Sequence, residues 1–138
     1  MDNMLLLMFV IILVGGLVLL AVVSQLGRRG SGLDHALFRK RWQRIEGLQK
    51  QGGAGWELAI IEADKLLDHA LKARGYSGET MGERLKSARA VFRNNDHVWQ
   101  AHKLRNRIAH EGDIHLNTIV VGRALRQFKA GLKDMGAL

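Results

Sequence analysis

The chain has 138 residues, of which 47% are hydrophobic, and a formal net charge of +8 at pH 7. This length allows one ordinary domain at most, and the absence of cysteine excludes a disulfide framework, so nothing in the chain requires an oxidising compartment. All 21 Lys and Arg residues lie after position 27, so charged and apolar residues are unevenly distributed along the chain.

The first segment is apolar from Met4 to Val23 and contains no charged residue. About 20 apolar residues in a helix suffice to cross a hydrocarbon core of about 30 Å. Residues 1–26 are therefore predicted to form a transmembrane anchor. A cleaved signal peptide is the alternative, but it needs a positive amino-terminal region and a shorter apolar core. Met1, Asp2 and Asn3 supply no positive charge, so the retained anchor is favoured.

Basic residues follow the apolar segment closely, and the positive-inside rule therefore predicts a single-pass protein with its N-terminus outside and the rest in the cytoplasm. Residues 28–138 hold 21 basic and 12 acidic residues, a balance of +9. A basic cluster beside an anchor favours anionic lipid as a partner, or simple solubility there, over RNA, which stays possible. The candidate binding residues are Arg28, Arg29, Arg39, Lys40 and Arg41.

The part after the anchor is predicted to be helical. Glycines make residues 27–32 a linker, and residues 33–138 are expected to form one domain. Apolar residues at helical spacing predict helices over 33–50 and 56–74, the second with a continuous apolar stripe. The sequence from Thr80 to Glu83 matches a capping box, which predicts a third helix beginning at Met81.

Two more helices are predicted at about 97–111 and 117–135. The chain contains no proline and no convincing strand pattern. Short connections make neighbouring helices antiparallel. The predicted fold is therefore all-α: a transmembrane helix followed by an up-down bundle of about five helices.

One motif carries chemical information, the sequence RNRIAHE from Arg105 to Glu111. It resembles the HEPN superfamily, whose members carry an R-x(4–6)-H motif late in a small helical bundle, commonly as R-N-x-x-A-H. The segment AIIEADKLLDHALKARGYSG is similar to the long first helix of that bundle. The resemblance covers roughly residues 56–135.

The resemblance implies two kinds of function. Many HEPN proteins are metal-independent endoribonucleases that act as dimers, with two Arg-His motifs meeting at the interface, while others are non-catalytic binding or dimerisation modules. The matching positions are Arg105 and His110, with Asn106 as the polar residue after the arginine. Some members also use an acidic residue on an earlier helix, and Glu62 or Asp64 is a candidate for that part.

Arginine and histidine are also chemically suited to cleave RNA. Histidine titrates near neutral pH and can accept the 2′-hydroxyl proton, and the arginine fork fits phosphate oxygens. On a helix, however, Arg105 and His110 are roughly 140° apart, and Arg105 falls on the apolar side. It can therefore pair with an acid inside the bundle instead, with His110 at the helix end.

No cofactor or metal is predicted. The four histidines between positions 97 and 115 do not have the i, i+3 or i, i+4 spacing that metal ligands on a helix need. The favoured hypothesis is a membrane-tethered, non-catalytic HEPN-like module that interacts or dimerises on the cytoplasmic face, because a permanently membrane-bound chain without an inhibitor segment is an awkward toxin. The alternative is a metal-independent endoribonuclease that cleaves cytoplasmic RNA with Arg105 and His110. A homodimer is expected in both cases.

Overall fold

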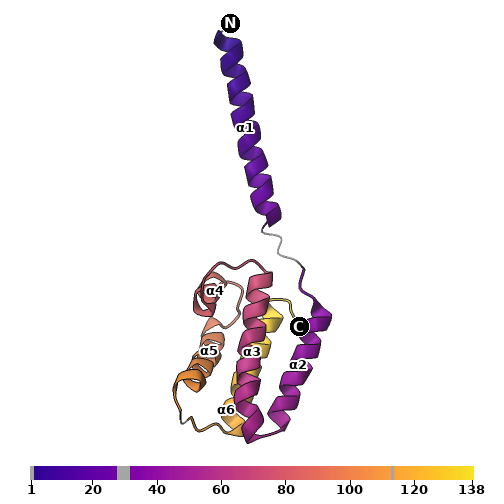
Figure 1. Ribbon diagram of the computed structural model, residues 1–138, viewed down its shortest axis with the longest axis vertical. Coiled ribbons are helices and arrows are strands. Elements are labelled where there is room, and N and C mark those ends of the chain that lie inside the picture. Colours follow the sequence, from indigo (N-terminus) through magenta and orange to yellow (C-terminus); the bar gives the residue numbers. More distant parts are fainter. Residues whose placement is uncertain (1, 28–31, 113) are drawn as a thin grey trace. The chain divides into compact units, whose positions relative to one another are not determined.

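A computed structural model of the chain describes residues 2–27, 32–112 and 114–138, with the side chains of 2, 3 and 24–27 left out (Figure 1). Within these ranges the chain is all-helical, with six helices and no strand, which confirms the predicted fold class. The chain divides into two compact units, Met1–Gly30 and Ser31–Leu138.

The N-terminal unit contains one helix, α1 (Asp2–Gly27). Its segment Met4–Val23 has a mean hydropathy of 3.2, and none of it is buried inside the structure. By length and composition, this helix can cross a membrane. The predicted anchor is thus one long apolar helix, as expected. The basic residues Arg28 and Arg29, predicted to bind lipid, lie outside the described residues.

The second unit holds five helices, as predicted. They are α2 (His35–Lys50), α3 (Gly53–Ala73), α4 (Met81–Ser87), α5 (Asn95–His110) and α6 (Thr118–Asp134). Figure 1 shows α2 and α5 running in one direction and α3 and α6 in the other, which is an up-down bundle.

Side-chain caps fix where most of these helices begin. The predicted capping box is present at α4: Thr80 Oγ1 accepts a hydrogen bond from the Glu83 backbone N–H at 3.2 Å, and Glu83 Oε2 accepts one from the Thr80 N–H at 3.4 Å. Asp34, Asn94 and Asn117 accept the corresponding bonds at α2, α5 and α6. Each cap satisfies a backbone donor that the first helical turn leaves free.

The start of α3 differs from the prediction, which placed it at Trp56. The helix begins at Gly53, and only Gln51 and Gly52 separate it from α2. Gly52 has a φ of 79°, a conformation that glycine adopts at little cost. A Cβ atom at Gly55 would collide with the carbonyl oxygen of Leu48. The glycines therefore permit a tight reversal and a close approach of two helices.

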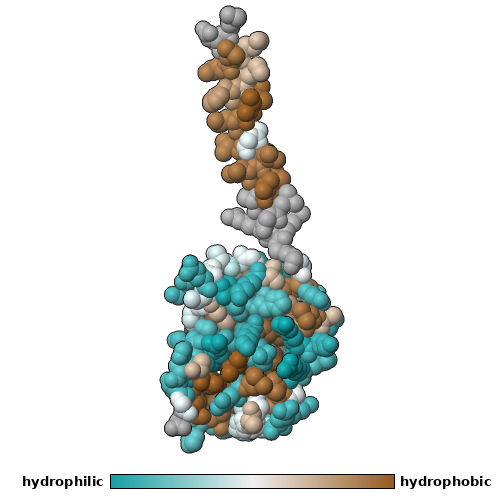
Figure 2. Space-filling model, viewed as in Figure 1, coloured by the Kyte–Doolittle hydropathy of each residue, from teal (hydrophilic) through white to brown (hydrophobic). Residues whose placement is uncertain are grey.

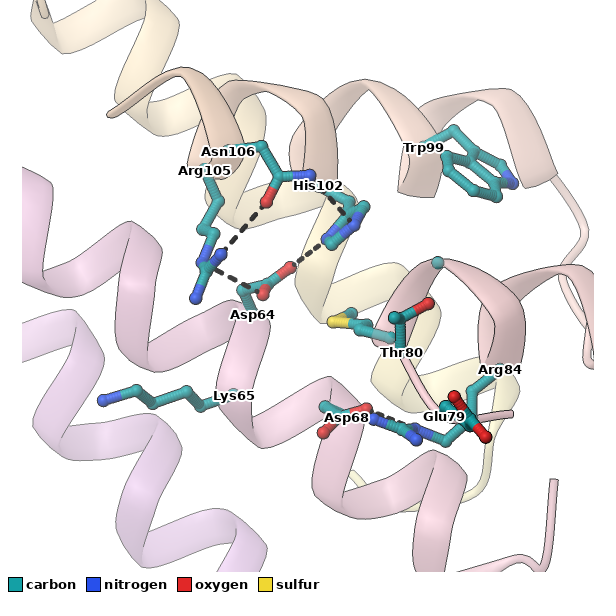
Figure 3. A pocket seen from close by; sticks show the side chains of 12 residues that line it. Asp64, Lys65, Asp68, Glu79, Thr80, Arg84, Trp99, His102, Arg105 and Asn106 are labelled. Atoms are coloured by element: carbon teal, nitrogen blue, oxygen red, sulfur yellow. Dashed lines mark hydrogen bonds and ion pairs between the residues drawn. The ribbon is translucent and has the colours of Figure 1, made fainter. Parts of the chain in front are cut away.

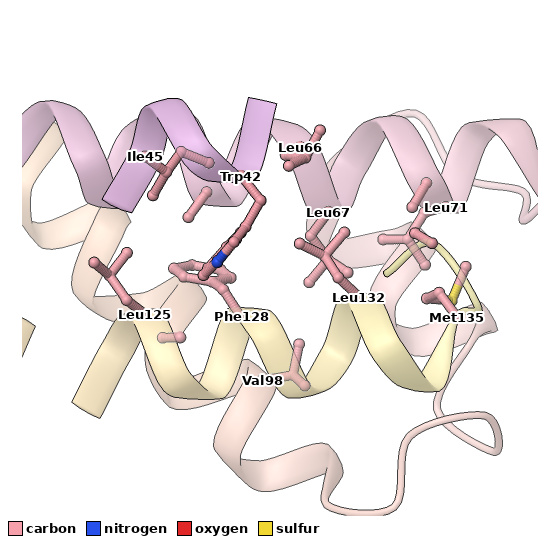
Figure 4. Packing of buried hydrophobic residues seen from close by; sticks show 14 of the residues in the cluster. Trp42, Ile45, Leu66, Leu67, Leu71, Val98, Leu125, Phe128, Leu132 and Met135 are labelled. Carbon is pink, nitrogen blue, oxygen red and sulfur yellow. The ribbon is translucent and has the colours of Figure 1, made fainter. Parts of the chain in front are cut away.

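The core of the bundle lies around α3, which contacts α2, α4, α5 and α6. Its predicted apolar stripe is buried, as are the inward side chains of α6 (Figure 4). The fully buried side chains of largest volume are Phe38, Phe128, Ile45, Ile60, Leu66, Leu67, Leu71, Leu85, Leu132, Val98 and Val121. The bundle thus has a complete hydrophobic core of its own.

Candidate functional site

Four polar side chains meet where α3 packs against α5. They are Asp64 from α3 and His102, Arg105 and Asn106 from α5 (Figure 3). On α5, positions three and four residues apart lie on the same side of the helix, so these three side chains face α3 together. Asp64 lies within the apolar stripe of α3, and its side chain is only 5% exposed.

These residues form a closed network, called here the Asp64 ring. Nδ1 of His102 lies 2.8 Å from Oδ1 of Asp64, and Nε2 of His102 lies 3.2 Å from Nδ2 of Asn106. Nη1 of Arg105 donates to Oδ1 of Asn106 at 3.0 Å. Nε of Arg105 lies 3.4 Å from Oδ2 of Asp64, which makes an ion pair, although this buried N–H has no hydrogen bond of good geometry.

The chemistry of the donors fixes the direction of every hydrogen bond in the ring. Arginine can only donate, so the Asn106 oxygen faces Arg105 and its NH2 group faces His102. Nε2 of His102 must then accept, and the imidazole proton lies on Nδ1 and is donated to the Asp64 carboxylate. Both ring nitrogens of His102 are therefore occupied within the ring.

A pocket of about 540 Å³ lies beside the Asp64 ring. All four ring residues line it, together with other side chains of α3, α4, α5 and the residues before α4, including Lys65, Thr80 and Trp99 (Figure 3). The indole of Trp99 meets the His102 imidazole edge-on, with ring centroids 5.9 Å apart. The pocket is thus lined by charges of both signs.

One wall of the pocket is held by Asp68 and Arg84. Nε of Arg84 donates to Oδ1 of Asp68 at 2.7 Å, its Nη1 donates to the carbonyl oxygen of Gly78 at 2.6 Å, and Lys72 contacts Oδ2 of Asp68 at 2.8 Å. Burial raises the pKa of Asp68, but the hydrogen bonds from Arg84 and Lys72 lower that pKa by more, so it lies below its ordinary range. This cluster joins α4 to α3 and shapes the pocket.

The predicted motif is divided in the structure. Arg105 and Asn106 belong to the Asp64 ring, and the Arg105 side chain is 30% exposed. His110 is the last residue of α5, is exposed and does not line the pocket, and its side chain makes no hydrogen bond or ion pair within residues 32–112 and 114–138. Of the two candidate acids, Asp64 lies beside Arg105, whereas Glu62 pairs with Lys65 at 3.4 Å.

The predicted lipid-binding residues that the structure describes are on α2. Arg39, Lys40 and Arg41 are all exposed. Nη1 of Arg41 lies 3.4 Å from Nδ1 of His69 on α3. This surface is separate from the Asp64 ring and the pocket beside it.

Sequence reasoning did not identify His102 as a member of the site. A signal was available, because His102 is three residues before Arg105 and four before Asn106. Asp64 was also visible as a charged residue within the apolar stripe, four residues after Ile60 and three before Leu67. In the described part of the chain, no group of three His, Cys, Asp or Glu residues is arranged to hold a metal ion.

Comparisons with protein-family models, with curated proteins and with solved structures gave no match to this chain.

Proposed function

We propose that this chain is a membrane-tethered, HEPN-like interaction module that pairs with a second copy of itself and does not cleave RNA. The observation that supports this most strongly is the Asp64 ring. Arg105 and Asn106, the first two residues of the motif, are engaged inside the domain by Asp64 and His102. Their role in this proposal is to hold α5 against α3.

Cleavage of RNA requires a base within hydrogen-bond reach of the 2′-hydroxyl and a cation facing the phosphate. His102 is well oriented by Asp64, but its Nε2 atom already accepts a hydrogen bond from Asn106. His110 does not line the pocket that Arg105 faces. Within one copy, neither histidine is therefore set up as a base beside Arg105.

The proposed pairing surface is an apolar patch on α3 and α5. Leu58 is 41% exposed, and Ile61, Leu104 and Ile108 are half-buried. Figure 2 shows hydrophobic surface gathered over these two helices, on the lower part of the bundle. An exposed apolar patch with a polar rim is typical of a protein interface.

The charges around this patch favour a second copy as the partner. Glu57, Glu62 and Lys65 lie on α3, and Arg107 and Glu111 lie at the end of α5 and directly after it, so the rim carries both signs. A twofold interface pairs one patch with itself and therefore needs such self-complementarity. The outer faces of α2 and α6 are dominated by basic residues and would repel their own copies.

One observation favours the ribonuclease as a second candidate. Asp64, on the earlier helix, lies beside the motif arginine, and Arg105 borders an accessible pocket. In a dimer, His110 of one copy can approach Arg105 of the other, so the missing base would come from the partner. This alternative predicts that the protein cleaves RNA.

A fragment beginning near Leu33 can test both candidates, because the bundle has its own core and buries none of α1. We expect the fragment to be dimeric by analytical ultracentrifugation and to leave RNA intact. Ile61→Glu should weaken the dimer at least about tenfold, since one buried charge costs more than about 1.4 kcal/mol. The control Ile119→Glu changes an exposed isoleucine on α6 and should leave the dimer affinity unchanged.

Two results would contradict this proposal. A monomeric fragment would exclude pairing through the bundle. Cleavage that leaves 2′,3′-cyclic phosphate ends and is lost in both Arg105→Ala and His110→Ala would establish the ribonuclease instead. The cytoplasmic location is tested separately by a reporter fused after Leu138 of the whole chain, which should remain unexported because all basic residues follow α1.

A further inference from the structure

The outer face of α6 is strongly basic and carries no acid. Its exposed residues are Ile119, Arg123, Arg126, Ala130 and Lys133, which recur at helical spacing opposite the buried side of the helix. We call this surface the α6 outer face. Solubility requires only that the outer side of an amphipathic helix be polar. It therefore does not explain why this face carries cations and no acids.

The cations of this face have no acidic partner in the described residues. Lys129, which points to a different side, is paired with Glu46 at 2.8 Å, and Asp134 is paired with Arg93 at 3.3 Å. Arg123, Arg126 and Lys133 make no ion pair within the same ranges. Their charges are therefore free to attract an external anion.

A groove of about 460 Å³ adjoins these arginines between α5 and α6. Arg123 and Arg126 line one side, and His97 and Gln100 of α5 line the other. Gln127 donates to Gln100 at 3.1 Å across its floor. No carboxylate lines this groove. Arginine forks with amide and imidazole donors form a set of groups that suits phosphate oxygens.

The groove also indicates which phosphate compound binds. No Phe, Tyr or Trp side chain lines it, so the His97 imidazole is its one aromatic ring, and it lacks the row of aromatic side chains on which successive bases of single-stranded RNA stack. Ile119 is 70% exposed at the start of the same face. The apolar face of α6 is buried in the core, but Ile119 can enter the headgroup region of a membrane while the neighbouring cations contact anionic headgroups.

Attachment by α1 keeps the bundle close to a membrane, so lipid headgroups are the nearest source of phosphate. The seven residues between α1 and α2 can extend at most about 25 Å. We infer that the α6 outer face binds the phosphate groups of anionic phospholipids in the membrane that α1 enters. This inference depends on membrane attachment by α1 but not on dimerisation.

The test uses the whole chain with Ala130→Cys, which is its only cysteine. An environment-sensitive dye on this cysteine is followed in nanodiscs of phosphatidylcholine alone and in nanodiscs that also contain phosphatidylglycerol. In the anionic discs we expect a blue shift and protection from an aqueous quencher. Both effects should disappear at about 0.5 M salt, where charges are screened within a few ångströms.

Substitution then identifies the residues responsible. Arg123→Gln with Arg126→Gln should lower the ratio of docked to undocked domain about thirtyfold, since each basic residue near an anionic surface contributes about fivefold. The matched control is Lys86→Gln with Arg89→Gln, which removes the same charge from exposed positions on and just after α4. The control should retain most of the protection.

Four results would overturn the inference. The first is equal protection of the dye from the quencher in neutral and anionic discs, and the second is an equal loss of this protection in the α6 and control variants. The third and fourth are protection of the dye in neutral discs when glycerol phosphate or single-stranded RNA is added. The last two would assign the groove to a soluble phosphate or to RNA. Failure of dimerisation affects none of these readouts, so the two proposals stand or fall separately.

Discussion

Replacing Asp64 with alanine is expected to lower the free energy of unfolding of the bundle by about 3 kcal/mol. The substitution removes the acceptor for His102 Nδ1 and the counter-ion of Arg105 at one buried position. Removal of one partner from a buried pair costs about 3–5 kcal/mol. The lower end applies because Arg105 is partly exposed and can turn toward solvent in the pocket. Urea denaturation of the fragment from Leu33, followed by circular dichroism, measures this change.

The neighbouring acid provides the control. Glu62 lies on the same helix two residues earlier, and its ion pair with Lys65 is exposed to solvent. Glu62→Ala should therefore change the free energy of unfolding by less than about 1 kcal/mol. Equal effects of the two substitutions would show that the Asp64 ring does not hold α5 against α3.

Phe128→Ala is expected to cost more, about 3–5 kcal/mol, because it leaves a large cavity in the core. Phe128 is fully buried on α6. Figure 4 shows its ring and that of Trp42 pointing into the same layer of the core. The indole of Trp42 is held in place by a 2.7 Å hydrogen bond to Glu46. Thermal and urea denaturation of the same fragment measure the loss.

An exposed apolar residue on the same helix is the comparison for Phe128. Ile119→Ala should change the free energy of unfolding by no more than about 0.5 kcal/mol, because Ile119 is exposed in the bundle. Should Phe128→Ala have an effect of similar size, α6 would not be packed into the core as described.

Local patterns predicted most of the fold. The stripe on α3 and the capping box before Met81 depend only on residues within one helix, and both are present as expected. The start of α3 lies three residues before the predicted one, because consecutive glycines favour a break in a helix when only local sequence is considered. Gly55 is required by the Leu48 carbonyl on another helix, and a contact of this kind is not visible in local spacing.

The site was harder to predict, because its key contact joins residues far apart in the sequence. Asp64 and His102 are separated by 38 positions. Helical periodicity places each residue on a face of its own helix, but it does not say how α3 and α5 are rotated against each other. The spacing of Arg105 and His110 predicts a site at the end of α5, whereas packing against α3 brings His102 to Asp64.

The Asp64 ring also has a consequence for how such chains diverge. Each of its four residues contacts two neighbours, so replacing one leaves a polar atom of each of those two neighbours without its partner. A chain in which only some of the four residues are replaced is then less stable than a chain with the complete ring. It is also less stable than a chain in which apolar residues of the same volume replace all four. Among descendants of one ancestor, we therefore expect the four positions to be inherited as a set and to be lost as a set.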